Sequence, residues 1–552
     1  MNRRHLLGYG SSALAGLMLD VPALRAFAQD ARSTPGATVE TTAGKIRGLL
    51  LDPRVHAFRG VPYGATTAGR RFLPPAKPLA WRGVREAYDH GRRSPVVDSA
   101  IVPEFDTLNR REPMGEDCLV LNIWTPNPDA AKRPVMVWLH GGGYMAGSAG
   151  WTCYDGGELA RKHDVVVVGV NHRLNAFGFV YLAELGGERY RDASNQGMRD
   201  IIQSLEWVRD NIAAFGGDPG SVTVFGQSGG AGKVSHLMGM PAAKGLFHKV
   251  IVQSGSAVTS QSTAAATRSA EQLLANLGLS PAQLDRLATL PVEQLLAGMR
   301  PRNDFEERSR AQAPRRAGGG GFQAAPVVEG DSLPASVFDP KASPLSAHVP
   351  MMIGSTETEV TWSLNTSYHV PDENALRARV ARAVGINPAE AAEVIEVYRS
   401  GRPQASALDL ALIIETDASN FRTGTDSQAA RKVTAGGAPV YMYRFQWYTP
   451  VGGGRLRSMH CLDIPFVFDN VDACRAITGN GADRQPLADR MSAAWAAFAR
   501  SGNPNHRGIP SWQPFTLDRR QTMMFGNECR AVEDPFRRER LLTTARRLQS
   551  SG

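Results

Sequence analysis

A single serine lies between glycines at the point where a strand-like run of the sequence changes into a helix-like one. The run is VTVF at 222–225, and Ser228 follows it within the stretch GQSGG at 226–230. A G-x-S-x-G turn is sharp enough to lift the serine oxygen above the edge of a sheet, because small flanking residues let the backbone pack closely. Glycine and serine are also common in ordinary turns. The pattern makes Ser228 a candidate nucleophile, and the other groups that such a serine needs should occur elsewhere in the chain.

A nucleophilic serine needs three further kinds of group. A base must take its proton and an acid must orient the base. Hydrogen-bond donors must hold the oxyanion that forms when a carbonyl is attacked. Consecutive glycines can supply such donors, because their N–H groups are not screened by a Cβ, and the stretch HGGGY occurs at 140–144. An HGGG segment upstream of a G-x-S-x-G turn indicates acyl-transfer chemistry.

Strand-like and helix-like patterns that could position these motifs alternate from residue 41 to residue 255. Apolar, β-branched runs predict buried strands at 134–139, 164–169 and 249–252. Residues 200–212 predict an amphipathic helix between two of these strands. Alternation of this kind favours an α/β fold with helices on the faces of a sheet.

The second half of the chain is expected to complete the same sheet. The pattern is helical from 256 to about 299, and strand-like segments return at 349–354 and 440–445. No internal repeat is present in the sequence. Residues 29–552 are therefore expected to form one domain.

The composition excludes several classes of protein. The 552 residues are 42% hydrophobic and 21% charged, which is ordinary for a globular protein with a sizeable core. The formal charge is +9, yet no basic run is interleaved with aromatics and no DNA-binding motif occurs, so we expect no nucleic-acid partner. The five cysteines are scattered without metal-ligand spacing, so we expect no metal, no cofactor and no disulfide framework.

The first 28 residues resemble an export signal. Arg3 and Arg4 precede an apolar run, and the small-residue sequence AFA at 26–28 provides a cleavage site. The apolar run is too short for a membrane span, and no later segment is apolar enough for one. A twin-arginine leader implies a bacterial protein that is exported already folded, so we expect a periplasmic or secreted location.

Further blocks of sequence follow one another in a distinctive order. They are FRGVPY at 58–63, RFLPP at 71–75, GEDCLVLN at 115–122, NHRLNAFG at 171–178, FGGDP at 215–219, QSGS at 253–256 and WAAFARSGNPN at 495–505. With the two glycine motifs, they resemble the type B carboxylesterases, the family that includes the cholinesterases, through most of residues 44–515. The resemblance implies the α/β-hydrolase fold, with a large central, mostly parallel sheet flanked by helices. It also implies hydrolysis of carboxylic esters through an acyl-enzyme.

The resemblance also implies where the acid and the base lie, because the family order is Ser, Glu, His. Glu359 comes five residues after Gly354, which ends a strand-like segment, and this is the usual place of the acid. Glu357 is the nearby alternative. His460 precedes the apolar run IPFVF and matches the histidine of the family.

Four more positions match family residues around the serine. Gly142, Gly143 and Gly229 match the donors of the oxyanion hole, and Ser254 matches a serine that makes a hydrogen bond behind the triad.

Two pairs of charged residues match family ion pairs that are structural rather than catalytic. They are Arg71 with Glu116 and Arg173 with Asp200.

The chain departs from the cholinesterase pattern in three ways. The residue before the nucleophile is Gln227, where the family usually has glutamate. No tryptophan lies between Trp81 and Trp124 to stack on a quaternary ammonium group, and Cys118 has no upstream partner to close the usual disulfide loop. All three departures argue against choline esters.

The expected substrate is a small to medium ester that is uncharged or acidic. An arginine-rich stretch at 300–316 has a net charge of +3 and would favour acidic esters if it borders the site, although it could equally be a solvated loop. An amidase or carbamate hydrolase using the same site is the main alternative. A noncatalytic binding protein on the same fold and a long-chain lipase are weaker alternatives. The sequence does not predict the oligomeric state.

Overall fold

The computed structural model describes residues 33–96, 101–109, 112–191, 193–300 and 322–550. The predicted leader at 1–28 lies outside the described residues, as does all of the arginine-rich stretch beyond Arg300.

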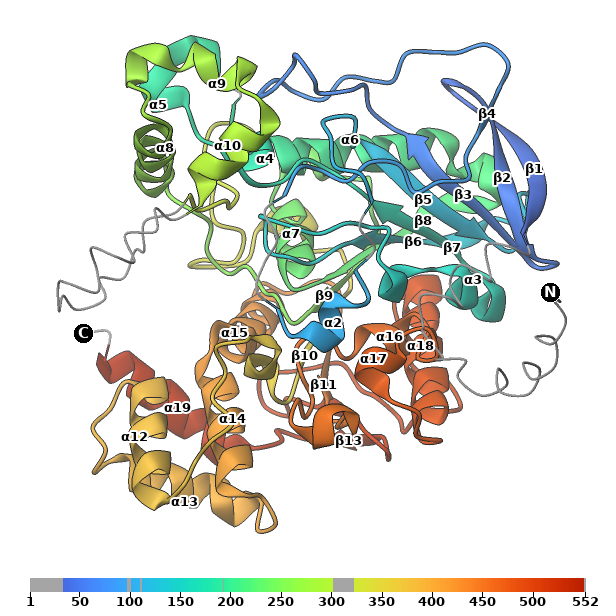
Figure 1. The fold of residues 1–552 in the computed structure, drawn as a ribbon. Helices are drawn as coiled ribbons and strands as arrows, with labels where there is room; N and C mark the ends of the chain where they lie inside the picture. Colours follow the sequence, from blue (N-terminus) through green and yellow to red (C-terminus); the bar gives the residue numbers. More distant parts are fainter. Residues whose placement is uncertain (1–32, 97–100, 110–111, 192, 301–321, 551–552) are drawn as a thin grey trace, which may run out of the picture.

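Within the described residues, 13 strands form one sheet, seen in Figure 1. In spatial order they are β1 (Thr34–Thr41), β2 (Gly44–Asp52), β3 (Val55–Pro62), β5 (Val120–Thr125), β7 (Val166–Val170), β6 (Arg133–Leu139), β8 (Gly217–Gln227), β9 (Lys249–Gln253), β10 (Met351–Thr356), β11 (Val440–Phe445), β12 (Thr522–Phe525) and β13 (Arg530–Val532), with β4 (Val84–Glu86) beside β2. The strands from β7 to β12 are parallel, and antiparallel pairs lie at both edges. The predicted α/β fold with a large, mostly parallel sheet is confirmed.

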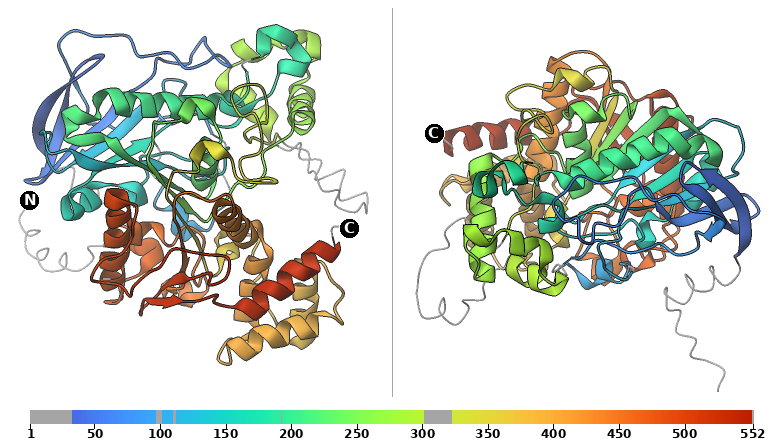
Figure 2. Two further views of the ribbon diagram at one scale, coloured as in Figure 1. Left: turned by 180° about the vertical axis from the view of Figure 1, so that it is seen from behind. Right: turned by 90° about the horizontal axis from the view of Figure 1, so that it is seen from above.

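Helices cover both faces of the sheet, so its central strands are apolar on both sides. Val135, Val137 and Leu139 of β6 pack with α6 (Gln196–Asn211) and α7 (Gly229–Leu237), whereas Met136 and Trp138 face the other layer. This second layer contains α3 (Gly157–His163), α16 (Ile464–Val467) and α18 (Arg484–Ser501). Figures 1 and 2 show the sheet between the two layers. Successive residues of a strand point to opposite faces, which explains why the buried strands read as continuous apolar runs.

Two groups of helices extend beyond these layers. One group has its own hydrophobic core, which is formed by α4, α8, α9 and α10. The core of the other group is formed by α12, α13, α14 and α19. These helices and the other short ones are α2 (Pro103–Asp106), α4 (Asn175–Phe179), α5 (Ala183–Gly186), α8 (Thr263–Leu277), α9 (Asp285–Thr289), α10 (Val292–Met299), α12 (Glu373–Val384), α13 (Ala391–Gly401), α14 (Ala407–Ala418), α15 (Asn420–Thr434), α17 (Arg475–Thr478) and α19 (Arg537–Ser550). Figure 1 shows the two groups on the same side of the molecule, above and below the level of the sheet.

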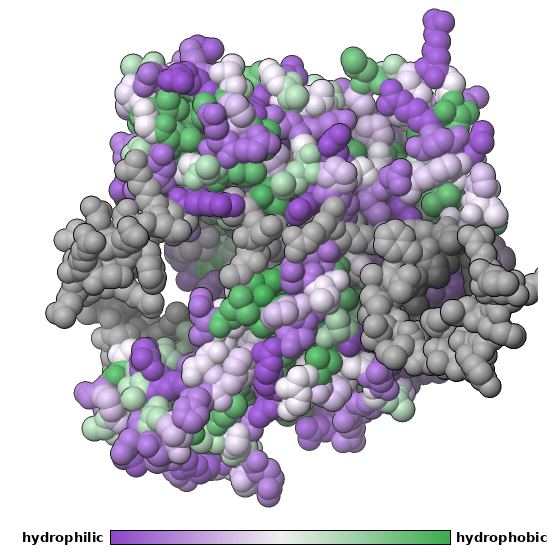
Figure 3. All heavy atoms as spheres, in the orientation of Figure 1, coloured by the Kyte–Doolittle hydropathy of each residue, from purple (hydrophilic) through white to green (hydrophobic). Residues whose placement is uncertain are grey.

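The surface is mixed in character. Hydrophilic residues predominate on the face that Figure 3 shows, and hydrophobic residues are interspersed among them. Across the described ranges, no helix combines the length and apolar character needed to cross a membrane.

Both predicted ion pairs form. Arg71 donates two hydrogen bonds to Glu116, at 2.8 and 2.7 Å. Arg173 donates through Nε and Nη2 to Asp200 at 2.8 and 2.6 Å, and its backbone N–H reaches the same carboxylate at 3.0 Å. The second pair joins the loop after β7 to helix α6 and is buried, with exposed side-chain fractions of 2% and 0%.

We predict that Asp200→Asn lowers the free energy of unfolding by about 3–5 kcal/mol, because it leaves the buried guanidinium of Arg173 without its counter-charge. The control is Asp210→Asn in the exposed pair Arg209–Asp210, where we expect a change below about 0.5 kcal/mol. Denaturant unfolding of both variants provides the measurement. Equal, small changes would show that Arg173–Asp200 is not needed for stability.

Candidate active site

The residues with candidate chemistry gather at one edge of the sheet. Ser228 directly follows β8, and the loop His140–Tyr144 directly follows β6. Glu359 begins the short 3₁₀ helix η7 (Glu359–Trp362) just beyond β10. These three strands are parallel, so their carboxyl ends meet at the same edge, where sites of α/β proteins are usually built.

Ser228 has a backbone conformation that residues other than glycine rarely adopt, with φ 57° and ψ −127°. The sharp turn is fixed on one side by its N–H, which donates to the carbonyl of Gln253 at 2.8 Å, and on the other by helix α7, which starts at Gly229. The residue is half-buried, and its hydroxyl makes no hydrogen bond to any described residue. The turn therefore holds the hydroxyl available at the strand end.

The glycine loop lies directly against the serine turn. A Cβ on Gly229 would come within 2.0 Å of the carbonyl oxygen of Gly143, and one on Gly142 within 2.3 Å of the carbonyl oxygen of Ala146. Gly142 and Gly143 also have φ values of 91° and 61°, which favour glycine. Both are exposed, and the N–H groups of Gly142, Gly143 and Gly229 donate to no other group in the described chain. Such amides can receive a ligand oxygen.

Glu359 and His460 form a close pair. The Nδ1–H of His460 donates to Oε2 of Glu359 at 2.5 Å, and Oε1 of Glu359 accepts from the N–H of Thr356 at 2.7 Å. The loops that carry the pair are joined next to it, where the N–H of Thr358 donates to the carbonyl of Ser458 at 3.1 Å. The carboxylate and the imidazole are thus oriented by main-chain contacts on both sides.

Glu357, the alternative acid, points elsewhere. Its two oxygens accept hydrogen bonds from Gln446 at 2.7 Å and from the hydroxyl of Tyr448 at 3.0 Å. Neither oxygen is within hydrogen-bonding distance of His460, so the geometry favours Glu359.

The ring of His460 is 4% exposed and packs against Trp362 and Phe421, at centroid distances of 5.8 and 4.6 Å. Burial lowers the pKa of His460, but the adjacent Cys461 and the carboxylate of Glu359 outweigh it and raise the pKa above its ordinary 6.5. Glu359 therefore stabilises the protonated imidazole, as the acid of a triad does.

The side chain of Gln227 lies against both ring nitrogens of His460. Its Nε2 is 3.1 Å from Nε2 and 3.3 Å from Nδ1 of His460, and its Oε1 accepts from the thiol of Cys461 at 3.2 Å. No hydrogen bond joins His460 to Ser228 in the described chain. The amide of Gln227 thus lies beside the imidazole of His460.

Lys233 is a functional candidate that the sequence reasoning missed. It lies on α7, is fully buried, and donates to the carbonyl of His140 at 3.0 Å, which fixes the start of the glycine loop. Burial lowers its pKa to about 7. The only signal for this residue in the sequence is its place as a lysine in the first turns of the apolar helix that follows Ser228.

Ser254 does not make the hydrogen bond that the resemblance implied. Its hydroxyl is buried without a partner among the described residues, while its backbone N–H donates to the carbonyl of Gly354 at 2.8 Å. The adjacent Gln253 makes the side-chain contact instead, donating to Asp463 at 2.9 Å. Ser254 therefore ties the ends of β9 and β10 together through its backbone.

The described residues hold no group of three or more His, Cys, Asp or Glu side chains placed to bind a metal ion. All five cysteines, each of which lies in the described ranges, are free.

This sheet, with a serine turn and a glycine loop at its carboxyl edge, defines a hydrolase of the α/β-hydrolase fold. The sequence pattern of the Carboxylesterase family matches residues 35–543, so the chain belongs to that family and is a carboxylic ester hydrolase.

Known proteins are similar to this chain over almost its whole length. The para-nitrobenzyl esterase of Bacillus subtilis (strain 168) is 33% identical over 500 residues, which cover 90% of this chain and 96% of the relative. The phenmedipham hydrolase of Pseudarthrobacter oxydans is 31% identical, covering 88% and 94%. Among solved structures, a Clostridium hathewayi esterase that can hydrolyze aliphatic aromatic polyesters superposes with a TM-score of 0.78 at 33% identity, covering 93% of this chain and 99% of its own.

We predict that Glu359→Gln lowers kcat by about 10⁴-fold, because an amide can no longer stabilise the imidazolium form of His460. Glu357→Gln is the matched control, since it makes the same change two residues away, and should change kcat less than about threefold. Steady-state kinetics on a chromogenic ester measures both. A large loss in the Glu357 variant alone would transfer the role to Glu357.

The activity should also depend on pH. As the expected base, His460 must be neutral to accept a proton, so the acid limb of kcat/KM should lie above pH 6.5, following the raised pKa of His460. Gln227→Glu adds a carboxylate beside Nε2, favours the protonated ring and should move this limb to higher pH. Gln227→Met, which stays neutral, should not raise it. A limb that moves to lower pH in the Glu variant would contradict this electrostatic coupling.

Proposed function

We propose that the protein hydrolyses carboxylic esters through an acyl-enzyme, with Ser228 as nucleophile, His460 as base and Glu359 as acid. The observation that carries the proposal is the 2.5 Å contact between Glu359 and His460 at the edge where Ser228 and the glycine amides also lie. The residues come in the chain order Ser, Glu, His, which is the order found in α/β-hydrolases.

In the proposed reaction, the side chain of Gln227 moves away from Nε2 of His460 when the substrate binds. His460 then takes the proton of Ser228 as the serine oxygen attacks the ester carbonyl. The N–H groups of Gly142, Gly143 and Gly229 hold the negatively charged oxygen. His460 returns the proton to the leaving alcohol, and water repeats the sequence on the acyl-enzyme to release the carboxylic acid.

We propose uncharged esters of small to medium size as the main substrates, with acidic esters tolerated. A neutral amide at position 227 removes a carboxylate that could attract a cationic alcohol group. The names of the relatives support the same class, since one is a para-nitrobenzyl esterase and another can hydrolyze aliphatic aromatic polyesters.

We also propose that the protein is exported. The support is the arginine pair at positions 3 and 4, the apolar run and the small-residue cleavage sequence at 26–28.

We expect a fluorophosphonate probe to label Ser228, because the probe reacts only with a serine whose proton a nearby base removes. Ser228→Ala should abolish both labelling and turnover of a neutral chromogenic ester. Mass spectrometry of the labelled peptide identifies the modified residue. The substrate class is measured by comparing kcat/KM for matched neutral, anionic and choline esters and for the corresponding amide.

The control for this experiment is Ser254→Ala, which removes a buried serine hydroxyl at the end of β9 and should leave labelling intact. Labelling of another serine, with activity retained in Ser228→Ala, would overturn the mechanism. A choline ester or an amide turned over faster than the neutral ester would overturn the substrate class instead.

A further inference from the structure

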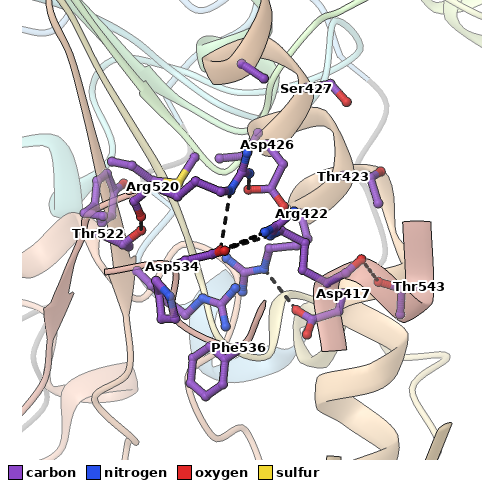
Figure 4. Close-up of a pocket in the computed structure, with 17 residues that line it drawn as sticks. Asp417, Arg422, Thr423, Asp426, Ser427, Arg520, Thr522, Asp534, Phe536 and Thr543 are labelled. Carbon is purple, nitrogen blue, oxygen red and sulfur yellow. Dashed lines mark hydrogen bonds and ion pairs between the residues drawn. The ribbon is translucent and has the colours of Figure 1, made fainter. Parts of the chain in front are cut away.

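A cavity of about 670 Å³ lies outside the edge that carries the serine turn. It is lined by residues of α15, β11, β12 and the stretch 534–543, which includes the start of α19; Figure 4 shows these lining residues. Ser228, Glu359 and His460 are not among its lining residues. The volume falls within the range of about 300–1,000 Å³ that is typical of small-molecule sites.

The walls of this cavity are rich in charge. Arginines 422, 444, 520 and 540 and aspartates 417, 426 and 534 line it, which leaves one positive charge in excess. Figure 4 shows the ion pairs that cross it. Arg422 pairs with Asp417 at 3.0 Å, and Arg540 pairs with Asp534 at 2.8 Å. Arg520 lies 3.5 Å from Asp426 and 3.6 Å from Asp534.

Arg444 is the exception among the four. It is 9% exposed, yet its guanidinium makes no hydrogen bond or ion pair with any described residue, and its Nη1 is fully buried without a partner. Its guanidinium lies over the ring of Phe536, at 4.7 Å, and the carboxylates of Asp417 and Glu357 act on its charge from beyond ion-pair distance. Burial lowers the pKa of Arg444 to about 10, so the side chain still carries its charge at neutral pH. A buried guanidinium nitrogen without a hydrogen-bond partner is costly, because buried polar groups normally have partners.

We propose that this cavity binds a small organic molecule with a single carboxylate, which pairs with Arg444. One excess positive charge matches one negative charge, and the guanidinium fork binds a carboxylate through two parallel hydrogen bonds. Apolar lining from Met442, Pro535, Phe536 and Ala430 provides space for an aliphatic or aromatic body beside the charge.

The proposed site shares no lining residue with the serine, glutamate and histidine of the candidate active site. Arg422 closes the cavity toward strand β10, where it donates to the carbonyl of Thr356 at 2.8 Å and to the hydroxyl of Ser355. Its neighbour Phe421 lies on the other side, against the ring of His460.

The experiment titrates benzoate into the full-length protein by calorimetry, in a chloride-free buffer, and compares Arg444→Met with Arg507→Met. Arg507 is exposed and makes no hydrogen bond to a described residue, so its substitution removes the same charge away from the cavity. We expect Arg444→Met to weaken benzoate binding at least tenfold and Arg507→Met to leave it unchanged. Benzamide, which lacks the charge, should not bind at this site.

A second variant keeps the test decisive if Arg444→Met does not fold. Ala430→Phe fills the cavity without removing a charge, and it should also weaken benzoate binding at least tenfold. Equal affinity in wild type and both variants would overturn the site. Benzamide binding as strongly as benzoate would overturn the role of the charge. Inorganic phosphate or chloride binding more tightly than benzoate would overturn the assignment to a carboxylate.

Discussion

The active-site edge depends on the close contact of backbone with backbone at the ends of strands β6, β8 and β9. A Cβ on Gly230 would lie 1.9 Å from the carbonyl oxygen of Leu139, and one on Gly255 would lie 1.9 Å from that of Ser228. Together with the contact of Gly229 and Gly143, these glycines let three strand ends meet without any side chain between them. The serine, its turn and the glycine amides are then set by the sheet itself rather than by flexible side chains.

Around this rigid backbone, a few buried side chains set the charges. Glu359 favours the protonated form of His460, whereas burial opposes it. Lys233 lies beneath the glycine loop and has a pKa of about 7, so its charge is sensitive to pH in the neutral range. The charge of this edge therefore depends on pH at Lys233 as well as at His460.

Sequence reasoning predicted the α/β fold and most central strands, because apolar β-branched runs are characteristic of strands buried on both faces. It placed β11 at residues 440–445 and β6 at 134–139, within one residue of the observed bounds. The choice of Glu359 over Glu357 relied on the family resemblance, since two glutamates two residues apart cannot be separated by composition.

The contacts that the sequence could not predict are those between side chains far apart in the chain. Gln227 lies on His460, although 232 residues separate them, and its effect was predicted only as a loss of charge. Arginines 422, 444, 520 and 540 surround one cavity because β11, β12 and the start of α19 meet there, and no local pattern indicates such a meeting. The hydroxyl of Ser254 has no partner among the described residues, whereas its backbone N–H donates to Gly354, and neither fact could be read from the sequence.

The order of the strands also has a consequence for protein synthesis. From β8 to β12 the sheet grows in the order in which the ribosome makes the chain, each strand pairing with the edge of the one before. Residues 254–350 must be made before β10 can cover β9, and all five residues of β9 are buried in the finished fold. Until then the nascent chain presents an open apolar edge that other chains can pair with. Chaperone protection should matter most during this interval, when Ser228 has already been made but Glu359 and His460 have not.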